Sequence, residues 1–152
     1  MATIVDTGPL FALANERDHF HEAVRDDVRA HPDTWVVPAP VAAEASIAIL
    51  DRLGAGAELS FLRSLASEEM LVEPRADSDL RRAIEILEQH RDGEFGLIDA
   101  ATRAIAERLN INVILTLDRR DFAIFRPRHC AAFRLVPEAA RSRRRLKRPH
   151  YV

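Results

Sequence analysis

The length and composition of the chain limit what it can be. Its 152 residues, 47% hydrophobic and 30% charged, suffice for one well-packed domain and are few for two. No apolar run approaches the roughly 20 residues of a membrane span, and Asp6 interrupts the only apolar segment that could open a signal peptide. Cys130 is the only cysteine, which excludes an intramolecular disulfide and a thiolate metal site. We therefore expect a cytoplasmic protein with no membrane contact.

Charge is distributed unevenly along the chain. The formal net charge is −2, but residues 141–148 hold six of the 22 basic residues and no acidic ones, which leaves 16 basic and 24 acidic residues elsewhere. A basic tail on an acidic body indicates contact with a polyanion or with the body's own acidic surface, and a solvated end is the alternative. We divide the chain into one domain over residues 1–137 and a basic C-terminal tail over residues 138–152.

Short apolar strands and helices alternate in the predicted structure. In chain order we predict a strand at 2–5, a helix that begins at residue 7, a helix at 18–31, a strand at 34–37, helices at 41–53 and 57–66, a strand at 70–72, helices at 79–89 and 97–109, and a strand at 113–117. Pro9 and Pro40 suit helix starts, and Gly54 and Asn110 suit helix ends. The two helices on either side of Gly54 form a helical hairpin.

The predicted strands lack the alternation of apolar and polar residues that is typical of a sheet with one solvent-exposed face. Strands that are apolar throughout are buried on both sides, and their alternation with helices indicates parallel pairing. We therefore predict an α/β fold, with a central, short-stranded parallel sheet flanked by helices and the helical hairpin as an arm.

Four acidic residues stand near the ends of these elements. Asp6 and Asp118 directly follow predicted strands, Asp99 lies in the first turn of a helix, and Glu44 lies in the helix after the second strand. Ligands bind at the carboxyl ends of the strands in open α/β sheets, so all four can meet at one edge. Two carboxylates about 5 Å apart repel by roughly 3 kcal/mol at an effective dielectric near 20, so such a cluster binds a cation or takes up protons. Carboxylate oxygens suit Mg²⁺ or Mn²⁺.

Each acid taken alone also has a structural explanation. Asp6 could cap the helix that follows it, and Asp118 could be a turn residue. Asp99 lies where the helix dipole favours a carboxylate, with Arg103 four residues later as an ion-pair partner. Glu44 has no basic residue among its helical neighbours, so it needs a partner from another segment or a cation.

The residues around the four acids resemble a known family. They are Ile4-Val5-Asp6-Thr7-Gly8, Glu44 in its helix, Gly96-Leu97-Ile98-Asp99-Ala100 and Leu115-Thr116-Leu117-Asp118-Arg119-Arg120-Asp121-Phe122. Over about residues 2–136 they are similar in order and spacing to PIN-domain ribonucleases, most closely to the VapC-type toxins of prokaryotic toxin–antitoxin pairs. The resemblance implies a PIN-like fold and a Mg²⁺- or Mn²⁺-dependent endoribonuclease. It also implies a homodimer that a cognate antitoxin holds inactive.

The resemblance assigns roles residue by residue. It implies that the catalytic residues, which also hold the metal ion, are Asp6, Glu44, Asp99 and Asp118. Thr7 and Thr116 match flanking hydroxyl positions, and Asp121 is either a supporting acid or the cap of a short turn. Arg119 and Arg120 lie beside the motif and are candidates to bind RNA. No histidine occupies a motif position, so we expect hydrolysis by a cation-activated water, which leaves 5′-phosphate and 3′-hydroxyl ends.

Other classes of protein share part of this pattern. Asp6-Thr7-Gly8 matches the aspartic protease signature, but that fold is nearly all β and the pattern after Gly8 is helical. A phosphoryl-accepting receiver domain would need paired acids after the first strand and a lysine late in the sheet, and the sequence has neither. A non-toxin PIN-domain RNA-processing nuclease and a non-catalytic binding protein on the same fold remain as alternatives.

Overall fold

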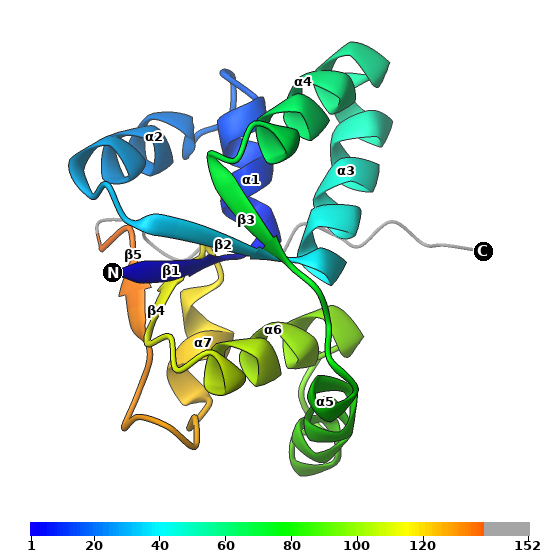
Figure 1. Ribbon diagram of the computed structural model, residues 1–152, viewed down its shortest axis with the longest axis vertical. Helices are drawn as coiled ribbons and strands as arrows, with labels where there is room; N and C mark the ends of the chain where they lie inside the picture. Colours follow the sequence, from blue (N-terminus) through cyan, green and yellow to red (C-terminus); the bar gives the residue numbers. More distant parts are fainter. Residues whose placement is uncertain (139–152) are drawn as a thin grey trace.

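A five-stranded parallel sheet forms the centre of the molecule (Figure 1). The computed structural model describes residues 1–138, so residues 139–152 of the predicted basic tail lie outside the described part. The strands are β1 (Ala2–Val5), β2 (Thr34–Pro38), β3 (Met70–Glu73), β4 (Val113–Leu115) and β5 (Arg134–Val136). Their order in the sheet is β3-β2-β1-β4-β5, and every neighbouring pair is parallel. The predicted α/β class is confirmed.

Helices cover both faces of the sheet. They are α1 (Thr7–Ala14), α2 (His21–Ala30), α3 (Ala39–Leu53), α4 (Ala55–Ala66), α5 (Asp77–Gln89), α6 (Leu97–Arg108) and α7 (Arg119–Ile124). Helices α1 to α4 lie on one side of the sheet and α5 to α7 on the other (Figure 1). The predicted helical hairpin is α3 and α4, joined at Gly54, whose φ of +91° is rare for residues with a side chain. None of the helices in residues 1–138 is long and apolar enough to cross a membrane.

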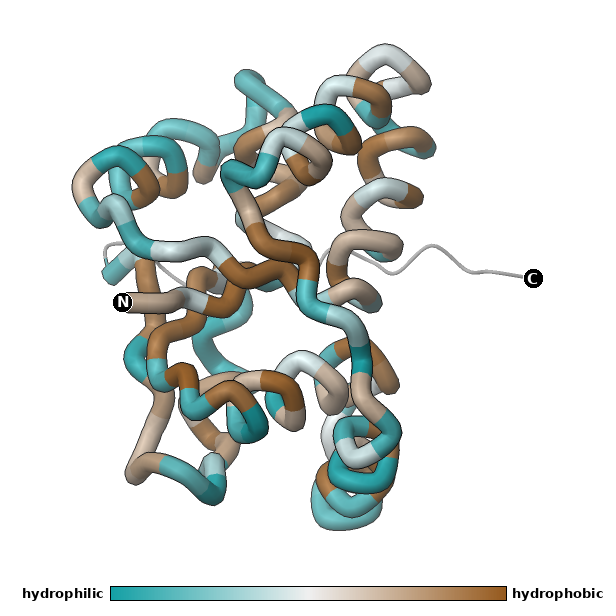
Figure 2. The backbone as a smooth tube through the Cα atoms, viewed as in Figure 1, coloured by the Kyte–Doolittle hydropathy of each residue, from teal (hydrophilic) through white to brown (hydrophobic). Residues whose placement is uncertain are grey.

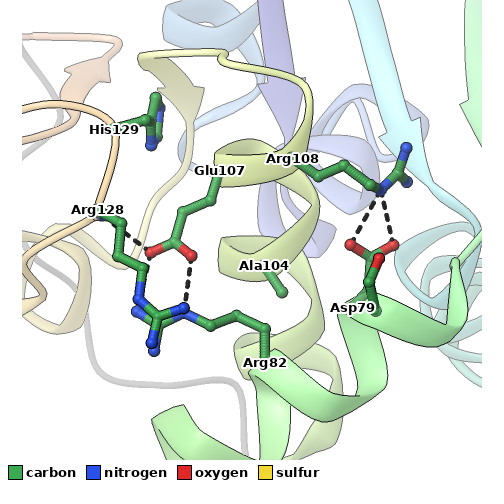
Figure 3. A pocket seen from close by; sticks show the side chains of 8 residues that line it. Asp79, Arg82, Ala104, Glu107, Arg108, Arg128 and His129 are labelled. Atoms are coloured by element: carbon green, nitrogen blue, oxygen red, sulfur yellow. Dashed lines mark hydrogen bonds and ion pairs between the residues drawn. The ribbon is translucent and has the colours of Figure 1, made fainter.

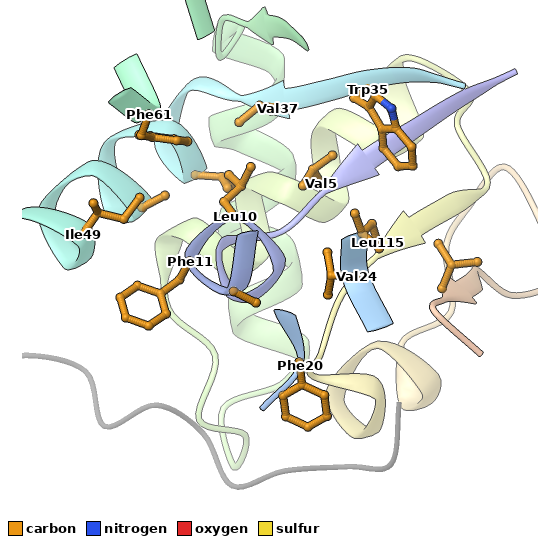
Figure 4. Packing of buried hydrophobic residues seen from close by; sticks show 14 residues of the cluster. Val5, Leu10, Phe11, Phe20, Val24, Trp35, Val37, Ile49, Phe61 and Leu115 are labelled. Atoms are coloured by element: carbon orange, nitrogen blue, oxygen red, sulfur yellow. The ribbon is translucent and has the colours of Figure 1, made fainter. Parts of the chain in front are cut away.

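Two hydrophobic cores lie on the two faces of the sheet. Successive strand residues point to opposite faces, so β1, β2, β4 and β5 each contribute to both cores. The edge strand β3 contributes only the partly buried Met70 to the first core, and its Leu71 and Val72 are exposed, so the predicted burial on both sides does not hold for this strand. In β2, Trp35 and Val37 pack with the side chains of α1 to α4, whereas Val36 packs with those of α5 to α7. Figure 4 shows the first core, with Leu10 of α1 among the strand side chains. The strands are hydrophobic along most of their length (Figure 2), as expected for a sheet buried on both sides.

Two short elements near the C-terminal end of the domain were not predicted. Helix α7 has six residues, and β5 has three and pairs with β4 from Val113↔Arg134 to Leu115↔Val136. Neither is long enough to show a helical or strand period in the sequence. Strand β5 forms because β4 offers it a free edge, which is a property of the assembled sheet.

The order of the strands reverses between β1 and β4. From β1 the chain builds β2 and β3 on one side, and it then returns to build β4 and β5 on the other. Crevices at the carboxyl ends of the strands beside such a reversal are the usual ligand sites of open α/β sheets. The main-chain N–H of Asp6 donates to the carbonyl of Leu115 at 3.0 Å, so the chain just after β1 lies against the end of β4.

Candidate metal centre

One buried hydroxyl connects the acids that follow β1 and β4. Thr116 is fully buried, and its Oγ1 donates to Asp6 Oδ2 at 2.9 Å. The same oxygen accepts a hydrogen bond from the main-chain N–H of Asp118 at 3.0 Å. In the described part of the chain, the Asp6 carboxylate makes no capping hydrogen bond to α1, so capping does not explain this residue. The hydrogen bonds of Thr116 instead link the two residues that follow β1 and β4.

Glu44 reaches the same edge from α3. Its Oε2 accepts a hydrogen bond from Thr7 Oγ1 at 2.7 Å, and Thr7 directly follows Asp6. The partner that Glu44 needed from another segment is therefore this hydroxyl. Both threonines of the motif thus position a carboxylate of the predicted set: Thr7 holds Glu44, and Thr116 holds Asp6.

Asp99 begins α6 and has a structural role there. Its Oδ2 accepts a hydrogen bond from the main-chain N–H of Gly96 at 3.2 Å, which satisfies an N–H at the helix start. Arg103 donates from Nη1 to the main-chain carbonyl of Asp99 at 2.7 Å. Asp99 also influences the other acids, because its negative charge helps to raise the pKa of Asp6 and of Asp118.

The pKa values of two acids show that negative charge is crowded here. Burial, and after it the charge of Asp99, raises the pKa of Asp6 to about 6, although the hydrogen bond from Thr116 opposes the shift. Burial and then the charge of Asp121 raise the pKa of Asp118, also to about 6. Carboxylates that repel one another in this way are neutralised either by protons or by a cation. The oxygen-only donor set fits a hard divalent cation.

The carboxylates do not converge on a common position where a metal ion could bind. In residues 1–138, no group of three or more histidine, cysteine, aspartate or glutamate side chains is positioned to hold a metal ion. The links between the acids are pairwise, through hydroxyl groups and through charge repulsion. Binding a cation would therefore require the side chains to turn toward it.

The remaining predicted residues lie around this edge. Asp121 is in the first turn of α7 and interacts electrostatically with Asp118. Arg119 donates from Nη1 to the carbonyls of Leu135 and Pro137, at 3.2 and 2.9 Å, and so ties the start of α7 to the end of β5. Arg120 is exposed. Of the two candidate RNA-binding arginines, Arg119 therefore has a structural role, and Arg120 is the more available.

The burial of one arginine near this edge is not predicted from the sequence. The spacing makes Arg103 an ion-pair partner of Asp99, yet Arg103 is 1% exposed, and its guanidinium carbon lies 4.3 and 4.0 Å from the ring centroids of Phe95 and Phe122. A signal was present: Ala100, Ala101 and Ala104 put Arg103 in an almost wholly apolar stretch of helix. An arginine in such a stretch is buried only with special partners.

A pocket between α5 and α6 lies away from the acids (Figure 3). It lies at the C-terminal end of α6, whereas Asp99 lies at the N-terminal end. Arg82 binds Glu107 through Nε and Nη2 at 2.8 and 3.0 Å, and Arg108 Nε binds Asp79 at 3.0 and 3.1 Å. These pairs join the two helices, so we assign them to stability.

Comparison with known proteins identifies the family. A family model described as the PIN domain matches residues 3–126, which is most of the chain. The chain belongs to the PIN domain family. The match covers all four acids, from Asp6 to Asp118, and confirms the family predicted from their flanking residues.

The individual relatives are VapC proteins and a toxin-antitoxin complex. The chain is 33% identical over 134 residues to Ribonuclease VapC26 of Mycobacterium tuberculosis, covering 88% of this chain and 99% of that one. Among solved structures it is similar to VapC20 of M. tuberculosis, a "Sarcin-Ricin loop cleaving toxin", with a TM-score of 0.70 and 22% identity over 74% of this chain and 86% of that chain. A toxin-antitoxin complex from Klebsiella pneumoniae gives a TM-score of 0.65 and 16% identity over 81% and 92%. The predicted likeness to VapC-type proteins is confirmed, and the chain shares the fold of these two solved structures.

Proposed function

We propose that this PIN-domain protein is a VapC-type toxin that cuts RNA as a divalent-cation-dependent endoribonuclease. The observation that supports the proposal is that Thr116 hydrogen-bonds to both Asp6 and Asp118, which follow β1 and β4, while the charge of Asp99 helps to raise the pKa of both acids. The curated relative is named a ribonuclease, which supports the reaction class. The excess of negative charge supports Mg²⁺ or Mn²⁺ as the cation.

The proposed reaction gives different roles to different residues of the chain. Asp6, Glu44, Asp99 and Asp118 would hold the cation through their oxygens. When bound, the cation would supply charge neutralisation at the scissile phosphate and a more acidic water. Thr116 and Thr7 restrict the rotation of the Asp6 and Glu44 carboxylates through their hydrogen bonds. Arg120, exposed at the rim, would attract the RNA backbone, so RNA affinity should fall steeply with salt.

Protein partners are part of the proposal. A relative of known structure is a toxin-antitoxin complex, which supports a cognate antitoxin. The outer faces of the α3–α4 hairpin expose large apolar side chains, which are Ile47, Leu50, Leu59 and Leu62. Exposed apolar surface of this kind favours protein contact. A homodimer is expected as well, and light scattering of the purified chain, alone and with the product of a neighbouring small gene, tests both associations.

Cleavage of labelled RNA by the purified full chain tests the reaction. We expect cleavage with Mg²⁺ or Mn²⁺, none with EDTA, and products that carry 5′-phosphate and 3′-hydroxyl ends. Asp99→Asn should lower the rate by at least about a hundredfold, because it removes charge from the centre. Asp51→Asn, an exposed change at the far end of α3, should cleave like the wild type.

Four results would contradict the proposal. Cleavage that persists in EDTA, or products with a 2′,3′-cyclic phosphate, would show a different chemistry. Full activity of Asp99→Asn would remove the metal centre from the reaction. No cleavage of any RNA, with a correctly folded protein, would favour the non-catalytic binding protein instead.

A further inference from the structure

A buried positive charge lies behind the acid cluster. Arg103 is 1% exposed, and its guanidinium carbon lies 4.0, 4.3 and 5.5 Å from the ring centroids of Phe122, Phe95 and Phe125. We call these three residues the phenylalanine cage. The faces of aromatic rings attract cations, and arginine remains charged in proteins. The fold therefore keeps one permanent positive charge out of water beside the proposed metal centre.

The hydrogen bonds of Arg103 do not account for its burial. Nη1 donates to the carbonyl of Asp99 at 2.7 Å, but Nε is buried and has no hydrogen-bond partner within residues 1–138. Leaving such a group unpaired costs about 1–3 kcal/mol. A leucine or methionine would fill the same cage without that cost. Packing and hydrogen bonding therefore do not explain why this buried position carries a positive charge.

The charge of Arg103 acts on the carboxylates of the proposed centre. Burial lowers the pKa of Arg103, and the negative charges of Asp99, Asp6, Asp121 and Asp118, in that order, raise it. In return, the Arg103 charge lowers the pKa of Asp6. The guanidinium thus interacts with the same negative groups that a bound cation would meet.

We propose that Arg103 is a built-in counter-ion of the metal centre, which holds the carboxylates together when no cation is bound and weakens their binding of a divalent cation by repulsion. This inference rests on the metal centre of the proposed function. Two positive charges that share one set of carboxylates oppose each other, so removing the fixed one strengthens binding of the other. An arginine with only a packing role predicts the reverse, because a disturbed cage would loosen the site.

Calorimetric titration of the full chain with Mn²⁺ at pH 8 tests this role. Arg103→Met removes the charge and keeps the cage filled, and Arg103→Gln removes the charge and keeps an N–H donor for the Asp99 carbonyl. Both should bind Mn²⁺ about tenfold more tightly than the wild type. The matched control is Arg108→Met on the same helix, whose partners are Asp79 and Glu73, and its Mn²⁺ affinity should be unchanged.

Thermal unfolding gives a second measurement that does not depend on activity. The rise in melting temperature on adding Mn²⁺ should be larger for the two neutral variants than for the wild type, because tighter binding stabilises the folded state more. If the wild type binds Mn²⁺ and both neutral variants bind it equally or more weakly, the counter-ion role is wrong, but the proposed metal centre is not contradicted. A wild type that binds no Mn²⁺ would overturn the metal centre and this inference with it.

Discussion

A single hydroxyl, that of Thr116, supports two of the proposed metal ligands. It donates to the Asp6 carboxylate and accepts from the N–H of Asp118, in a fully buried position. Thr116→Val keeps the shape but removes both hydrogen bonds, and we expect it to lower the free energy of unfolding by about 1–3 kcal/mol. RNA cleavage should fall as well. Thr116→Ser keeps the hydroxyl and should stay close to the wild type in urea unfolding, so equal stability of the Val and Ser variants would contradict this role.

The raised pKa of Asp6 has a consequence for stability. Its ordinary value is 3.8 and its value in the fold is about 6, so folding favours the protonated acid. The stability that this provides is complete below about pH 4 and is lost as the pH rises through 6. In metal-free protein at pH 7.5, the ionised Asp6 then costs up to about 3 kcal/mol.

Replacing Asp6 should therefore stabilise the metal-free protein. Asp6→Asn can still accept the Thr116 hydrogen bond, and in EDTA at pH 7.5 we expect a higher urea midpoint than for the wild type. The gain should shrink toward zero near pH 4, where Asp6 is protonated. Asp51→Asn, which changes an exposed acid, is the control and should show no such pH-dependent gain. A destabilised Asp6→Asn at pH 7.5 would show that the acid is not under electrostatic strain.

The interaction partners of individual residues could be predicted from the sequence only in part. The capping explanation of Asp6 depends on local geometry, which the structure does not support, and the partner of Glu44 is Thr7, 37 residues away. The cage around Arg103 combines Phe95, before α6, with two rings of the α7 region. Contacts of this kind depend on how distant segments pack, which no local pattern contains.

At the scale of elements, the α3–α4 hairpin depends on the conformation of Gly54. Its φ of +91° and ψ of 173° lie in a region that is essentially restricted to glycine, and an added Cβ would meet no atom within 4 Å. Gly54→Ala should therefore destabilise the protein through backbone strain alone, by about 1–3 kcal/mol.

Gly56 offers a matched control two residues further along. It lies inside α4, and an added Cβ there also meets no atom within 4 Å. Gly56→Ala should raise stability by up to about 1 kcal/mol, because alanine favours the helix. Thermal unfolding of both variants measures the difference, and equal effects of the two substitutions would contradict this explanation.

The longer elements were predictable because their signals are local. Helix α5 and the hairpin helices begin within two residues of their predicted starts and end where predicted, and Asn110 has the positive φ of 54° expected where a helix ends. Strand β5 and helix α7 were missed because three and six residues carry too little pattern. Their positions depend on pairing with β4 and on packing around Phe122 and Phe133.

In the whole molecule, stability and the proposed chemistry are separated along α6. Its C-terminal end is joined to α5 by ion pairs of Arg82 with Glu107 and of Arg108 with Asp79, where opposite charges compensate each other. Its N-terminal end faces Asp6 and Asp118, where like charges are crowded and the pKa values are raised. The C-terminal end of α6 is therefore electrostatically compensated, whereas the acids at its N-terminal end carry an excess of negative charge.

Titration with Mn²⁺ tests most directly whether a divalent cation compensates this excess of negative charge. We expect the wild-type chain to bind Mn²⁺ at pH 8, Asp99→Asn to bind at least about tenfold more weakly, and Asp51→Asn to bind like the wild type. Equal Mn²⁺ affinity of Asp99→Asn and the wild type, or no binding by the wild type, would contradict this expectation.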